Sequence, residues 1–86
     1  MKTLQSFLFI VLFSISSMLY AAQVNINTAD ANTLSNELAG IGQTKAQAII
    51  AYRELHGPYQ RIEDLANVNG IGMNTVEKNK AKLTTK

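Results

Sequence analysis

The feature that most constrains this chain is a glycine pattern that occurs twice. Gly40-Ile41-Gly42 is followed thirty positions later by Gly70-Ile71-Gly72, and each copy comes two residues after an aliphatic residue, Leu38 or Val68. An internal repeat of this kind indicates that one supersecondary unit is used twice. Because apolar residues at helical spacing flank each copy, we predict that the unit is a helix, a tight turn and a second helix.

Each turn combines features of a phosphate-binding site. Glycine permits positive φ and a close approach of the backbone to another molecule, while the isoleucine between the glycines provides one apolar anchor. The first N–H groups of the following helix lack partners within it, and the helix dipole makes that end partly positive. We therefore expect backbone N–H groups at both turns to bind phosphate oxygens. The alternative is that the glycines only allow tight packing of helices.

The first repeat is predicted to begin with a short helix. Asn27 or Thr28 is placed to act as its N-cap, and Asp30 favours the positive end of the helix dipole. The helix is expected to end near Glu37. Its apolar residues, spaced three and four apart and therefore on one face, are Ala31, Leu34 and Leu38.

The second helix of this repeat is predicted to start at Gln43 or Thr44 and to end near His56. Gly57-Pro58 follows, and this pair suits a helix end because proline cannot continue a helix. The side of this helix that faces the core is formed by Ala46, Ile49 and Ile50, with Tyr52 and Leu55 beside them. His56 is the only histidine of the chain and is expected to be an exposed helix-end residue.

The second repeat is predicted to be more polar than the first. A short helix is expected at about 62–67, and another after Gly72, capped by Asn74 or Thr75 and running to about Leu83. Asn79 and Lys80 stand where the first repeat has two isoleucines, so the last helix is expected to be held by Val76 and Leu83 alone. Residues 84–86 are expected to be a frayed tail.

The pattern resembles the helix-hairpin-helix motif, and the pair of motifs is similar to the tandem arrangement in the ComEA family of competence DNA-binding proteins. The resemblance runs from about Val24 to about Leu83. Its most specific parts are residues 24–31, 46–53, Gly57-Pro58-Tyr59 and Glu63-Asp64-Leu65, together with the two Gly-Ile-Gly turns. The resemblance implies an all-α tandem helix-hairpin-helix domain at 23–86, with four to five short helices related by pseudo-two-fold symmetry and repeats at about 28–57 and 60–84.

The same resemblance implies binding of double-stranded DNA through its phosphate backbone, without sequence preference, during DNA uptake in natural transformation. The inner-membrane DNA translocation machinery is then a further partner, and no cofactor, metal or small-molecule substrate is implied. A monovalent cation at the hairpins and the oligomeric state are left open. The predicted DNA-contacting residues are Gly40, Ile41, Gly42, Gln43, Thr44, Lys45, Gly70, Ile71, Gly72, Met73, Asn74, Thr75 and Lys78.

Several of the polar and aromatic side chains allow two interpretations. Lys45 is either an ordinary solvated lysine or a phosphate contact beside the first turn, and Lys78 at the basic end of the chain has the same two readings. Tyr59 is expected to fill the core beneath the loop between the repeats rather than to stack on a base. Arg53 and Arg61 are expected to be solvated.

The charge of the chain departs from the family pattern. Removing Lys2 with the leader lowers the formal net charge of +2 to about +1, which is far from the strongly basic profile of a binder that relies on charged side chains. The positions after the hairpins, often lysine in the family, are here Gln43, Thr44, Met73 and Asn74. DNA affinity should therefore be modest and come from backbone geometry.

Residues 1–22 have the composition of a secretory signal. Lys2 precedes a nearly continuous apolar run from Phe7 to Ile15, and small or weakly polar residues follow up to Ala21-Ala22. The apolar run is shorter than the roughly 20 residues that a transmembrane helix needs. We expect cleavage after Ala21 or Ala22 and export to the periplasm; the alternative is an uncleaved leader that anchors the domain to the inner membrane.

Two other classes of function compete with DNA binding. An exported structural or protein-interaction module would also suit the weak charge and the missing lysines. An enzyme is not expected, because no nucleophile with a base, metal cluster or pair of facing acids is evident. The glycines also fit a dinucleotide-binding fingerprint poorly, since no strand precedes them and the third glycine is absent.

Overall fold

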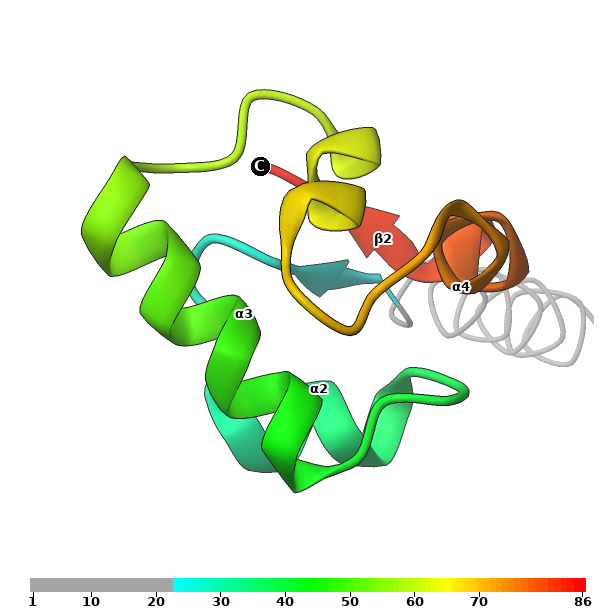
Figure 1. Cartoon of the computed structure of the whole chain (residues 1–86). Coiled ribbons are helices and arrows are strands. Elements are labelled where there is room, and N and C mark those ends of the chain that lie inside the picture. Colours follow the sequence, from blue (N-terminus) through cyan, green and yellow to red (C-terminus); the bar gives the residue numbers. More distant parts are fainter. Residues whose placement is uncertain (1–22) are drawn as a thin grey trace, which may run out of the picture.

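The computed structural model describes residues 23–86, so the predicted leader and its cleavage site lie outside the described residues. Helices dominate the fold, as predicted (Figure 1). Their order in the chain is α2 (Ala31–Glu37), α3 (Gln43–His56), the 3-10 helix η1 (Ile62–Asn67), α4 (Met73–Asn79) and the 3-10 helix η2 (Lys80–Lys82). Two strands of two residues, β1 (Val24–Asn25) and β2 (Leu83–Thr84), begin and end this series.

The two strands pair in parallel, which the sequence did not predict. Val24 is opposite Leu83 and Asn25 is opposite Thr84, and the N–H of Ile26 donates to the carbonyl of Thr84 at 3.0 Å. The prediction of a frayed tail at 84–86 is therefore wrong. The tail is ordered because main-chain hydrogen bonds from the start of the domain use its polar groups.

The start of α2 also differs from the prediction. Asp30, rather than Asn27 or Thr28, is the N-cap, and its carboxylate accepts from the N–H of Thr33 at 2.8 Å. These hydrogen bonds to Thr33 lower the pKa of Asp30. The side chain of Asn27 is used elsewhere, because its Oδ1 accepts from the N–H of Tyr59 at 2.7 Å and its Nδ2 donates to the carbonyl of Thr85 at 3.1 Å. Asn27 therefore joins the start, middle and end of the domain.

The ends of α3 agree with the prediction, whereas the N-cap of α4 does not. Gly57 follows α3 at φ 91°, in the left-handed region that glycine adopts without strain. Gly72 is the N-cap of α4, with no hydrogen bond from a side chain, so the predicted caps at Asn74 or Thr75 are wrong. The α-helix ends at Asn79, but the 3-10 helix η2 continues the helical segment to Lys82, close to the predicted end at about Leu83.

One hydrophobic core lies between the two repeats and beneath the loop that connects them. Tyr59 is buried there as predicted, and its hydroxyl donates to the carbonyl of Ile49 at 2.8 Å. Burial raises the pKa of Tyr59 to about 12, while the charge of Arg53 opposes the rise. The prediction that Arg53 is solvated is wrong, because its Nη1 donates to the carbonyl of Ile26 at 2.9 Å. The buried apolar residues are Val24, Ile26, Leu34, Leu38, Ile41, Ala46, Ile49, Tyr59, Leu65, Val68, Ile71, Val76 and Leu83.

Candidate nucleic-acid interface

The two Gly-Ile-Gly turns have the same pattern of burial. In residues 38–46 and again in 68–76, the first, fourth and ninth positions are buried, the eighth is half-buried and the others are exposed. The buried positions are Leu38, Ile41 and Ala46 in the first hairpin and Val68, Ile71 and Val76 in the second. The repeat seen in the sequence is therefore a repeat in the structure, with the same face of each turn open to solvent.

The first glycine of each turn is required by the backbone. Gly40 has φ 77° and Gly70 has φ 92°, a region in which residues with a Cβ are strained. In the second hairpin this geometry lets the N–H of Ile71 donate to the carbonyl of Val68 at 3.1 Å. Another residue at either glycine position would change the path of the turn.

The second glycine of each turn is not explained by the fold itself. Gly42 and Gly72 have φ of −86° and −101°, which other residues also adopt. A Cβ built at either position would meet no other atom of the described chain within 4 Å. The missing side chain therefore leaves open space next to the backbone, where an external group can approach.

Backbone donors next to these glycines have no acceptor within the described chain. In α3 the first backbone hydrogen bond of the helix is made by the N–H of Ala46, which donates to the carbonyl of Gly42 at 2.9 Å. In α4, Thr75 and Val76 donate to the carbonyl of Gly72 at 3.1 and 3.3 Å. Within residues 23–86 the N–H groups that precede these have no acceptor, and no side chain caps either helix. They belong to Gln43, Thr44 and Lys45 in α3 and to Met73 and Asn74 in α4.

The side chains predicted to contact DNA divide into three groups. Thr44, Met73, Asn74 and Lys78 are exposed, and Lys45 and Thr75 are half-buried. The side chain of Gln43 folds back onto α2, where its Nε2 donates to Asn32 Oδ1 and Ser35 Oγ, both at 3.0 Å. Ile41 and Ile71 are about 95% buried, so their side chains face the core and only their backbone is near the surface.

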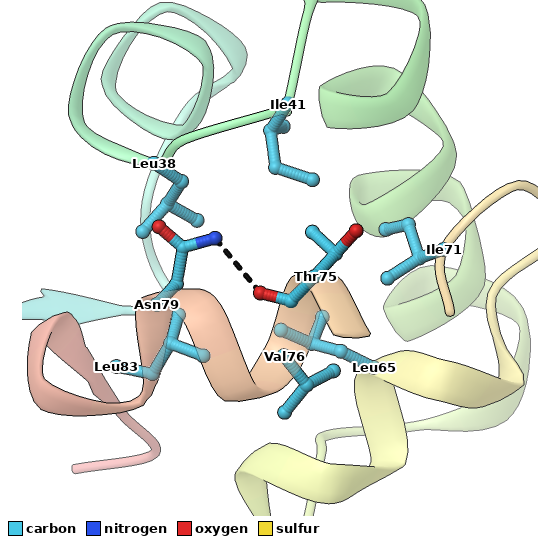
Figure 2. Close-up of a pocket in the computed structure, with 8 residues that line it drawn as sticks. All are labelled: Leu38, Ile41, Leu65, Ile71, Thr75, Val76, Asn79 and Leu83. Carbon is cyan, nitrogen blue, oxygen red and sulfur yellow. Dashed lines mark hydrogen bonds between the residues drawn. The ribbon is translucent and has the colours of Figure 1, made fainter. Parts of the chain in front are cut away.

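The two isoleucine anchors belong to the same hydrophobic core. Figure 2 shows Ile41 and Ile71 among the residues around a small pocket, together with Leu38 from the first hairpin and Val76 from the second. The pocket is lined mainly by apolar side chains, which come from both repeats. Because protein interiors are densely packed and resist deformation, this shared core holds one hairpin in a fixed relation to the other.

Asn79 is a functional candidate that the sequence reasoning missed. Its position in the second repeat corresponds to that of Ile49 in the first, and it was expected only to make the last helix polar. The side chain is instead 3% exposed and bonds to the backbone of Ala39, immediately before the first turn. The sequence does contain a signal for this role: Asn79 is a polar residue at a position that the repeat pattern assigns to the core.

The remaining charged groups of the interface are few. Lys82 Nζ donates to the carbonyl of Glu37 at 3.4 Å, at the end of α2. Arg61 is largely exposed and forms an ion pair with Asp64 at 3.6 Å.

Over the described residues there is no group of three or more His, Cys, Asp or Glu side chains that could hold a metal ion. No helix in that part of the chain is long and apolar enough to span a membrane.

The sequence of the two repeats is similar to that of known proteins. A sequence profile described as the helix-hairpin-helix motif matches residues 20–84. ComE operon protein 1 of Bacillus subtilis (strain 168) is 51% identical over 65 residues, which are 76% of this chain and 31% of that protein. An uncharacterized protein of Haemophilus influenzae is 48% identical over 61 residues, 71% of this chain and 54% of that protein.

The shared segment also occurs within larger proteins. Endonuclease/exonuclease/phosphatase family domain-containing protein 1 of Xenopus laevis is 42% identical over 60 residues, which are 70% of this chain and 11% of that protein. The chain thus spans about a third of the Bacillus protein and about half of the Haemophilus protein. The similarity covers the two hairpins and does not extend to the rest of these proteins.

Proposed function

Because the chain belongs to the helix-hairpin-helix family, we propose that it is an exported protein that binds double-stranded DNA through the phosphate backbone, without sequence preference. The resemblance to the ComEA family is confirmed by the similarity to ComE operon protein 1. We propose the same biological setting, the uptake of DNA during natural transformation, in which bound protein hinders the backward movement of incoming DNA.

One observation carries the DNA-binding proposal. Two helix starts with exposed N–H groups and no side chain in front of them are joined through Ile41 and Ile71 in one core. Two donor sites held at a fixed separation suit two phosphates, one from each strand, across the minor groove of a duplex. Backbone donors that contact phosphates carry no information about the bases, so binding should be independent of sequence and sensitive to salt.

The weak charge of the chain favours a second candidate, an exported protein-interaction module with the same fold. The formal net charge is +2 for the whole chain, and Gln43 is bonded to α2 rather than free to meet a ligand. A protein partner would use the same exposed turns without requiring positive charge. The two candidates therefore differ in whether the hairpins respond to polyanions.

Fluorescence anisotropy of residues 23–86 on a labelled duplex, titrated with salt, separates the two. Micromolar or weaker binding is expected, with a log-log salt slope that corresponds to about two to five phosphate contacts. Gly72→Glu should weaken binding by more than about tenfold because its carboxylate would repel the phosphate, while its far-UV CD stays unchanged. Ala51→Glu adds the same charge at an exposed position of α3 and serves as the matched control. Absence of wild-type binding at low salt would favour the interaction module.

Export and the role in uptake need tests in cells. Mass spectrometry of the periplasmic fraction should show a chain that starts at Ala22 or Gln23, whereas a full-length chain in the membrane fraction would indicate an anchor. Deletion of the gene in a naturally transformable host should reduce transformation, and the wild-type gene should restore it. A Gly72→Glu gene that restored transformation fully would contradict the proposed role of the second hairpin.

A further inference from the structure

We propose that Asn79 is a positioning residue that fixes the first hairpin against the second repeat, so that both hairpins contact one duplex together. This inference rests on the DNA-binding function proposed above. It concerns how the separation of the two phosphate contacts is maintained, and it assigns that task to a buried side chain that does not itself touch DNA.

The amide of Asn79 uses both of its polar atoms to hold the backbone. Its Oδ1 accepts from the N–H of Ala39 at 2.8 Å, and its Nδ2 donates to the carbonyl of Ala39 at 2.9 Å. The same Nδ2 donates to the carbonyl of Thr75 at 2.9 Å (Figure 2). Ala39 directly precedes Gly40, and Thr75 lies in the first turn of α4. One side chain therefore connects the start of the first turn to the helix that follows the second.

Packing alone does not explain a polar residue at this position. Ile49 occupies the corresponding position of the first repeat and is completely buried, so an aliphatic side chain is compatible with this place in the unit. Asparagine brings a buried amide that must find partners, and all its partners are on the first hairpin or in its own helix. Buried polar groups of this kind can fix one arrangement of elements rather than add stability.

A second contact crosses between the repeats nearby. Lys82 Nζ donates to the carbonyl of Glu37, so the end of α2 and the residue before the first turn both bond to the last segment of the second repeat. Two binding sites that are already held in place lose less freedom when they bind a common ligand. Release of the first hairpin should therefore weaken binding to a duplex that needs both.

Asn79→Leu tests the inference, because the leucine side chain has the same number and branching of heavy atoms and no hydrogen-bonding group. We expect duplex affinity to fall by about tenfold and the log-log salt slope to become shallower, as contacts at the first hairpin are lost. Ile49→Val is the matched control: it weakens the core at the equivalent position and leaves the bonds to Ala39 intact. Affinity should be unchanged in the control at a temperature where both variants are fully folded.

A double-mutant cycle locates the effect. If Asn79 acts through the first hairpin, Asn79→Leu should have little further effect in a Gly42→Glu background, so the two changes should be strongly non-additive. Hydrogen exchange measured by NMR should show that the Ala39 amide loses protection in Asn79→Leu and keeps it in Ile49→Val. Should Asn79→Leu fail to fold, Asn79→Asp replaces the donor with a second oxygen that faces two carbonyls, and affinity should fall as well.

The outcomes separate this inference from the function on which it depends. Wild-type binding together with unchanged affinity in folded Asn79→Leu would overturn the positioning role only. Additive effects of Asn79→Leu and Gly42→Glu would also overturn it, since they would indicate independent actions. Absence of wild-type binding would overturn both proposals.

Discussion

The two hairpins share one geometry but are supported in different ways. In the first repeat, α3 has 14 residues and the side chain of Gln43 is bonded to α2. In the second repeat, α4 has only 7 residues, the preceding helix is a 3-10 helix, and Met73 at the position equivalent to Gln43 is 46% exposed. The comparison teaches that a short local pattern is sufficient to form the turn, whereas its support comes from the rest of the domain.

The largest expected effect tests whether the two turns are equal partners in DNA binding. Gly42→Glu and Gly72→Glu should each weaken duplex binding by more than about tenfold, and the two affinities should agree within about threefold, because the two turns expose the same positions to solvent. Anisotropy titrations measure both constants. A Gly42→Glu protein with wild-type affinity would show that only the second turn binds DNA. The two hairpins would then differ in function as well as in structural support.

Asn27→Ala sharpens the distinction between support and positioning. This change removes three hydrogen bonds from Asn27 side-chain atoms to Tyr59 and Thr85. The free energy of unfolding should fall by about 2 kcal/mol, measured by urea denaturation. Duplex affinity of the folded protein should stay the same, in contrast to Asn79→Leu. Equal losses of affinity in the two variants would mean that any buried amide supports the hairpins equally.

Tyr59, whose hydroxyl donates to the carbonyl of Ile49 in the long helix α3, gives a prediction that depends on pH. The pKa of Tyr59 is raised to about 12 in the folded protein, whereas an unfolded tyrosine titrates near 10. Above about pH 10 the unfolded chain therefore releases this proton first, so stability should fall between pH 10 and 12. Thermal denaturation of Tyr59→Phe should show a smaller loss over this window. If wild type and Tyr59→Phe lost equal stability between pH 10 and 12, ionisation of Tyr59 would not be the cause of the loss.

The smallest expected effect compares the first helix of each repeat. Asp30 caps α2 through the N–H of Thr33, and Asp64 accepts from the N–H groups of Gln60 and Arg61 at the start of η1. Asp30→Ala should lower the melting temperature slightly at pH 7. Because the pKa of Asp30 is lowered in the folded state, the difference from wild type should disappear as the pH falls through that pKa. A difference that persists in strong acid would point to a cause other than the carboxylate.

Much of the fold could be predicted because it is encoded locally. The positive φ at Gly40 and Gly70, the bounds of α3 and the stop at Gly57-Pro58 each depend on residues within a few positions of one another. The burial of Tyr59 was also predicted correctly. These features follow from backbone sterics and from apolar spacing, both of which can be read from a single sequence.

The wrong predictions share a different physical cause. Asn27 was taken for an N-cap and Arg53 for a solvated residue, but both bond to backbone groups at least 27 positions away. The last residues were taken for a frayed tail, but Thr84 pairs with Asn25 at the other end of the domain. Local patterns do not reveal partners that only the folded chain brings together.

The candidate site was predicted unevenly for the same reason. The exposed turns were found from their glycines, while Ile41 and Ile71 proved to be core anchors and Gln43 a link to α2. Asn79 escaped notice because its partner Ala39 is 40 positions away. Contacts of the turns with DNA, and the leader at 1–22, stay predictions.

The parallel pairing of β1 with β2 has a mechanical consequence. Tension applied between the two ends of the domain would pull these strands along their length in opposite directions, so the hydrogen bonds between them would resist together, in shear. The turns at Gly42 and Gly72 lie outside the shortest path of that force. Tension between the two ends would therefore load the paired strands first and leave both hairpins undisturbed until the strands separate.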